Sequence, residues 1–167
     1  MLNNYFLTHL MLHALSTRQI SVEQVLELRA SIEVQSAQMA ARRRTTGDVQ
    51  RLRVAVAGMR KSCKDPNSFV LYDLDFHGVL NGTTGNPLVE VICGSMHECM
   101  KESMRVGILN RHGTNEILEV VENHGHIVDA IEKGSASRAA ELMKKHFEGA
   151  KRALQRQDIQ QSAQIRR

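Results

Sequence analysis

Asp73 and His77 have the residue types and the spacing to bind one metal ion together. They stand four residues apart in the segment 68–80, whose apolar pattern predicts a helix. Residues four apart project from the same face of a helix, one turn above the other. A lone ionised Asp on a buried face is costly, which favours a paired or cation-bound carboxylate. The remaining residues on that face are Phe69, Val70, Phe76 and Leu80.

Two further histidines interrupt aliphatic stripes near the end of the chain. His124 lies in a predicted helix over 114–133, and His146 lies in the next one, over 135–156. Both are equally distant from Ser135 along the chain, so an antiparallel hairpin places them at the same height. His126 falls on the opposite face from His124. We therefore predict that Asp73, His77, His124 and His146 converge inside a helical bundle.

This set of donors favours a divalent transition metal. Three neutral imidazoles and one carboxylate suit Zn, Ni, Mn or Fe, whereas Ca and Mg prefer shells made of oxygen atoms. If the metal takes more than four ligands, a coordination position stays open for a small carboxylate. The alternative is that the histidines are packed core residues that bind no metal.

The elements that must position these residues are helices, because no segment alternates with period two for long enough to form a strand. Pro66 in Asp65-Pro66-Asn67 predicts a turn. We expect an all-α, antiparallel bundle of six to seven helices with a central metal site. Ser21, Thr114 and Ser135 are the predicted caps. The predicted helices cover 4–15, 21–44, 68–80, 86–109, 114–133 and 135–156. A further predicted helix follows the break at 45–47 and ends at about 62.

Length and composition are consistent with one globular domain. The 167 residues are 42% hydrophobic and 24% charged. We expect an N-terminal helix or linker remnant over 1–20, the bundle over 21–157, and a frayed tail over 158–167. Three cysteines without C-x-x-C spacing indicate a reducing, cytoplasmic setting. The net charge of +4 comes from basic clusters scattered among acidic residues, so we read them as solvated faces.

Four short motifs in this order resemble the FCD domain, the C-terminal effector-binding domain of FadR-subfamily GntR transcription regulators. They are DLDFH at 73–77, GNP at 85–87, ENHGHIVDAI at 122–131 and MKKHF at 143–147, and LELRASIE at 26–33 resembles the family's opening helix. The resemblance covers about 21–154. It implies a helical bundle whose metal, bound by Asp73, His77, His124 and His146, helps to bind a small organic acid.

The resemblance also implies a homodimer that contacts DNA only through winged-helix domains. The family's winged helix-turn-helix has no counterpart in this sequence, and no DNA-reading motif is visible. The sequence leaves open whether the chain is a truncated regulator or a sensor without its own DNA-binding domain. No apolar run approaches the roughly 20 residues that span a bilayer, so no membrane partner is expected.

Three polar residues are candidates for binding the effector. Arg29 falls on the inward stripe of the second helix, where a guanidinium suits bidentate capture of a carboxylate. An intrahelical pair with Glu33 is the alternative for Arg29. Asn86 is either a ligand contact or, as we favour, a helix cap, and Arg105 is a further candidate.

The leading hypothesis is a metal-dependent sensor of a small hydroxy- or keto-acid in a transcription regulator, not an enzyme. A helical metalloenzyme that uses the same Asp and three His residues to activate water is the alternative. The sequence offers that enzyme no general base beside the four residues, and no Glu-x-x-His pair. A third hypothesis is a dimerisation module whose histidines only pack.

Overall fold

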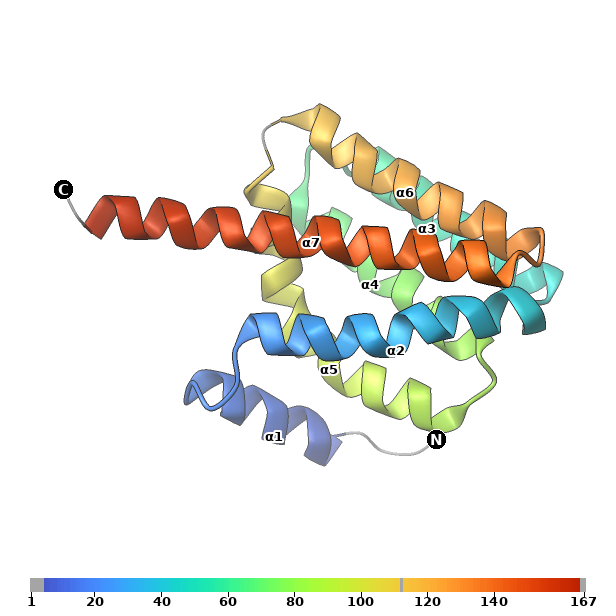
Figure 1. The fold of residues 1–167 in the computed structure, drawn as a ribbon, viewed down its shortest axis with the longest axis horizontal. Coiled ribbons are helices and arrows are strands. Elements are labelled where there is room, and N and C mark those ends of the chain that lie inside the picture. Colours follow the sequence, from blue (N-terminus) through green and yellow to red (C-terminus); the bar gives the residue numbers. More distant parts are fainter. Residues whose placement is uncertain (1–4, 112, 166–167) are drawn as a thin grey trace.

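The fold consists of helices joined by short connections (Figure 1). The computed structural model describes the backbone of residues 5–111 and 113–165, and their side chains except at 102, 103, 106 and 157–165. No strand occurs in this part of the chain, so the prediction of an all-α bundle is confirmed. The helices are α1 Tyr5–Ser16, α2 Val22–Arg43, α3 Thr46–Lys61, α4 Pro66–Thr83, α5 Pro87–Leu109, α6 Thr114–Glu132 and α7 Ala136–Ile165.

Capping residues fix where the first long helices begin. Ser21, the predicted cap of α2, forms a reciprocal capping box with Gln24: its hydroxyl accepts from the Gln24 N–H, and its own N–H donates to the Gln24 side chain. Thr45 and Asp48 make the same arrangement at α3, so this helix begins at Thr46, inside the predicted break.

Other helix ends also differ from the prediction, and α4 continues to Thr83, three residues beyond its predicted end. Asp65 and Pro66 do not form a turn: Asp65 caps α4 by accepting from the N–H groups of Asn67 and Ser68, and Pro66 is the first helical residue. Thr114 is the first residue of α6 rather than its cap, and the preceding Gly113 has a φ of 91°. The backbone of α7 stays helical to Ile165, because no Gly or Pro interrupts its last two turns.

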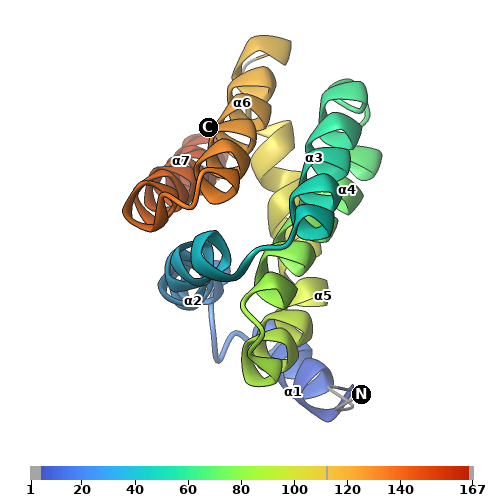
Figure 2. The same cartoon turned by 90° about the vertical axis from the view of Figure 1, so that its right-hand side faces the viewer.

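The bundle packs around α4 and α7. Helix α4 contacts α2, α3 and α5, whereas α7 contacts α2, α5 and α6 (Figure 2). Helices α2, α4, α6 and α7 therefore all face one interior region. Within the described residues, no helix is long and apolar enough to cross a membrane. The largest fully buried side chains include Leu52, Met59, Phe69, Phe76, Met96, Ile131 and Met143.

Gly58 lets α3 and α4 approach closely. A Cβ at this position would lie within 2.5 Å of three ring atoms of Tyr72 on α4. We expect Gly58→Ala to lose up to about 2 kcal/mol of unfolding free energy, because overpacking costs about 1–3 kcal/mol and the gain in helix propensity returns about 1 kcal/mol. Gly125→Ala is the matched control, since a Cβ there meets nothing within 4 Å and should stabilise α6. Urea unfolding of both variants checks the prediction, and equal stabilisation of the two would contradict it.

Candidate metal centre

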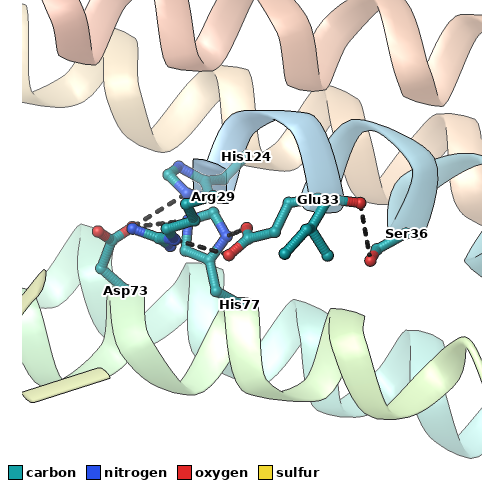
Figure 3. A network of polar contacts seen from close by, with 7 residues as sticks. Arg29, Glu33, Ser36, Asp73, His77 and His124 are labelled. Atoms are coloured by element: carbon teal, nitrogen blue, oxygen red, sulfur yellow. Dashed lines mark hydrogen bonds and ion pairs between the residues drawn. The ribbon is translucent and has the colours of Figure 1, made fainter. Parts of the chain in front are cut away.

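The structure brings the four predicted metal ligands together from three helices. Asp73 and His77 project from α4, His124 from α6 and His146 from α7. One ring nitrogen from each of the three histidines lies within 4.8 Å of the others. The Asp73 Oδ1 atom lies 3.0 Å from Nε2 of His124 and 3.8 Å from Nε2 of His77 (Figure 3). His126, two residues along α6, is exposed as expected.

Contacts to the outer nitrogens fix the tautomers of two imidazoles. Nδ1 of His124 lies 2.8 Å from the carbonyl oxygen of Val120, and Nδ1 of His77 contacts the carboxylate oxygen Oε2 of Glu33. Both partners can only accept hydrogen bonds, which favours a proton on each Nδ1. Nδ1 of His124 donates to the carbonyl, whereas the contact of His77 with Glu33 is an ion-pair contact without hydrogen-bond geometry. With the proton on Nδ1 alone, each ring presents the lone pair of its Nε2 atom towards Asp73. Metal-binding histidines are commonly oriented in this way by a carboxylate or a backbone carbonyl.

The electrostatics favour the neutral form of His77 and His146 and the charged form of Asp73. Burial, followed by the charge of Arg29, lowers the pKa of His77. Burial and the neighbouring imidazoles hold the pKa of His146 well below its usual range. Burial opposes ionisation of Asp73, but the adjacent His124 and the other two imidazoles keep its pKa below the ordinary value. Neutral imidazoles and an ionised carboxylate are the protonation states that bind metal.

These side chains fit a divalent transition metal. Oδ1 of Asp73 and Nε2 of His77 and His124 are buried, and none has a hydrogen-bond partner of good geometry among the described residues. A lone pair facing a carboxylate oxygen at 3.0 Å is repulsive unless a cation binds both. Imidazole nitrogens with one carboxylate make the donor set of Zn, Ni, Mn or Fe.

Glu33 supports the centre from α2, and sequence reasoning did not identify it as a site residue. Its Oε1 atom accepts from Nε of Arg29 at 2.6 Å, while its Oε2 atom contacts His77. The exposed fractions of Arg29 and Glu33 are only 4% and 1%. Burial alone would raise the pKa of Glu33, but Arg29 and His77 lower it to about 2. The four-residue spacing of Arg29 and Glu33 was the sequence feature that could have identified it. We interpreted that spacing only as an ion pair within the helix, the alternative to a ligand-binding role for Arg29.

A cavity of about 50 Å³ lies beside the candidate ligands, and Arg29 is one of the residues that line it. The Nη2 atom of Arg29 is buried without a hydrogen-bond partner in the described structure. Arg111, in the connection between α5 and α6, also lines the cavity and was missed, because no periodic pattern covers this connection. The other lining residues include Asp73, His146, Met100, Met104, Ile108 and Phe147.

The structure does not bring Asn86 and Arg105 to this cavity. The side chain of Asn86 accepts from the N–H of Leu88 at 3.1 Å, which is the capping role that we favoured. Arg105 lines a separate surface hollow together with Glu98 and Lys101. Of the three residues considered for the effector, only Arg29 reaches the candidate centre.

Comparisons with known proteins agree with this fold. The family model of the FCD domain matches residues 24–149. The chain is 25% identical over 138 residues to the HTH-type transcriptional regulator LutR of Bacillus subtilis (strain 168), covering 80% of this chain and 62% of that protein. The structure of Streptococcus agalactiae GntR superposes with a TM-score of 0.67 at 22% identity, covering 79% of this chain and 58% of the other, and shows the shared fold.

The chain spans about three fifths of the length of the regulator that it matches. No winged helix-turn-helix occurs among residues 5–111 and 113–165, all of whose helices belong to the bundle. The matched protein of Bacillus subtilis is named as an HTH-type transcriptional regulator. Because the family model matches about three quarters of the chain, the chain belongs to the FCD domain family.

Proposed function

We propose that this domain senses a small organic acid with the help of a divalent transition metal bound by Asp73, His77, His124 and His146. One observation carries the proposal. Three buried donor atoms, from Asp73, His77 and His124, converge without any hydrogen-bond partner of good geometry among the described residues. Zn, Ni, Mn and Fe all suit these donors.

The metal would supply positive charge at the cavity and an open coordination position for a carboxylate oxygen. Arg29 is suited to binding the same carboxylate, because its Nη2 atom is buried and unpartnered while its Nε is held by Glu33. The apolar side chains of Met100, Ile108 and Phe147 exclude bulk water from this side of the cavity. These features favour a short ligand with at least one carboxylate.

The output that we propose is conformational. A ligand shifts an equilibrium only as far as it binds one arrangement better than another. Here the ligand would join α2, through Arg29, to the metal held by α4, α6 and α7. In a complete regulator, which we propose to be a homodimer, this closure would change the placement of winged-helix domains on DNA. Support for the DNA link comes from the similarity to an HTH-type regulator.

Calorimetry tests the proposal directly. We expect Zn²⁺-loaded protein to bind members of a panel comprising lactate, pyruvate, malate and citrate, and chelator-treated protein to bind none of them. His146→Ala should lose both stoichiometric metal, measured by elemental analysis, and acid binding, because this residue lines the cavity and belongs to the histidine cluster. Unchanged acid binding after metal removal would exclude the metal from the mechanism.

A further inference from the structure

Arg111 brings a second guanidinium group to the cavity. It lies between the end of α5 at Leu109 and the start of α6 at Thr114, and it lines the cavity with Asp73 and His146. Its Nε atom is buried and has no hydrogen-bond partner among the described residues. A buried donor without an acceptor costs free energy, so an arginine held in this way is expected to have a ligand as its acceptor.

Carboxylates lie near Arg111, at Glu116, Asp73 and Glu119, but none of them forms an ion pair with it in the described part of the chain. The nearby carboxylate of Glu116 is bound by Arg156 at 2.9 Å. Burial is the main cause that lowers the pKa of Arg111. The positive charge therefore stays available for an anion that enters the cavity.

The charges around the cavity point to an anion that carries two negative charges. Arg29 and Arg111 contribute two positive charges, which balance the carboxylates of Glu33 and Asp73. A divalent metal on the proposed ligands adds two more positive charges. Because an uncompensated charge in a buried site is unfavourable, a dianion restores neutrality and a monoanion leaves one positive charge unpaired.

The two arginines reach the cavity from different elements. In Figure 1, α2 with Arg29 runs below α7, whereas the connection that carries Arg111 lies above α7. Two guanidinium groups that reach one cavity from different elements can each bind one anionic group of a single ligand. The cavity of about 50 Å³ holds about four water-sized spheres, and its wall includes Met100 and Met104, whose flexible side chains adapt to a bound molecule.

We infer that the effector is a short dicarboxylate, with one carboxylate at the metal and Arg29 and the other on Arg111. This inference rests on the proposed function and adds to it the charge of the ligand and the residue that selects it. Arg111 is thus a specificity-determining residue for the second carboxylate and not a general support of the fold.

Calorimetry on Zn²⁺-loaded protein with matched acids tests the inference. Succinate and butyrate have the same number of carbon atoms and differ in the second carboxylate, as do malonate and propionate. We expect each dicarboxylate to bind about tenfold or more tightly than its monocarboxylate partner, because a charge-assisted bidentate contact is added. Arg111→Gln should remove this preference by weakening dicarboxylate binding, with monocarboxylate binding changed by less than about threefold.

Arg138→Gln is the matched control, because it removes one positive charge from a half-exposed residue that does not line the cavity. It should leave the preference for the dicarboxylate intact. If Arg111→Gln is unstable in a thermal melt, Arg111→Lys replaces it, since Lys keeps the charge but loses the planar fork and should reduce the preference.

The outcomes separate this inference from the proposed function. Metal-dependent binding of both acids with equal affinity, and no change in Arg111→Gln, would overturn the dicarboxylate inference and leave the proposed function standing. Absence of binding by any acid to the metal-loaded protein would overturn both.

Discussion

Replacing His124 with Ala is expected to lower the affinity for Zn²⁺ by about 100- to 1,000-fold, the share of one ligand among four in a typical site. His124 is fully buried, and its Nε2 atom lies 3.0 Å from Oδ1 of Asp73. The variant removes a candidate metal-binding nitrogen, and the contact with the Val120 carbonyl already fixes the orientation of its ring. Competition with a chromophoric chelator measures the affinity.

His126→Ala is the control for this experiment, because it removes an exposed histidine from the same helix. It should leave the affinity unchanged. Glu33→Gln should give an intermediate loss of about 10- to 100-fold, since the orienting contact to Nδ1 of His77 is weakened while all four donors remain. Wild-type affinity in His124→Ala would rule out the proposed coordination.

Arg29→Ala should cost about 3–5 kcal/mol of unfolding free energy, because it leaves a buried carboxylate without its counter-charge. Arg29 and Glu33 are almost completely buried, and their Nε and Oε1 atoms lie 2.6 Å apart. The variant also loses the contact of the guanidinium with the Phe147 ring, 5.4 Å from its centroid. Urea unfolding of metal-free protein at neutral pH measures the loss.

Arg138→Ala provides the control for that loss. Arg138 pairs with Glu141 at 2.8 Å, but both side chains are about half exposed, so its replacement should change stability by no more than about 0.5 kcal/mol. If Arg29→Ala lost no more unfolding free energy than Arg138→Ala, the result would contradict a strong interaction between the buried Arg29 and Glu33.

The cost of Arg29→Ala should also depend on pH. The folded-state pKa of Glu33 is lowered from 4.5 to about 2, so the stability that its ionised form contributes is complete above pH 4.5 and is lost as the pH falls towards 2. The difference between the wild type and Arg29→Ala should therefore narrow over this range. A difference that widens on acidification would reverse the sign that we assign to Glu33.

The sequence predicted most of the candidate centre because its geometry is local. The four-residue spacing of Asp73 and His77 puts them on one helix face, and the equal distances of His124 and His146 from Ser135 set their heights in a hairpin. Both arguments need only helix geometry and the position of one turn. The structure places the four side chains together, as predicted.

Glu33 and Arg111 could not be predicted from the same patterns. The contact of Glu33 with His77 depends on how α2 packs across α4, which helix periodicity does not specify. Arg111 reaches the cavity through the path of an irregular connection, where no periodicity exists. Arg105, on the preceding helix, was the more visible arginine in the sequence, yet it lines another surface hollow.

The predicted start of α4 was wrong because proline is found both in turns and at the beginning of helices. Pro66 suggests a turn, but a proline is equally suited to the first position of a helix, and the side chain of Asp65 completes that helix start. The helix therefore begins two residues earlier than predicted.

The contacts of Nδ1 in His77 and His124 also affect how much side-chain entropy metal binding would cost. A side chain that is free in solution loses rotamer entropy when it coordinates an ion. Here two imidazoles are immobilised by Glu33 and by the Val120 carbonyl while the chain folds. The two rings are therefore preorganised, and binding of a metal at the proposed site would cost little side-chain entropy at either of them.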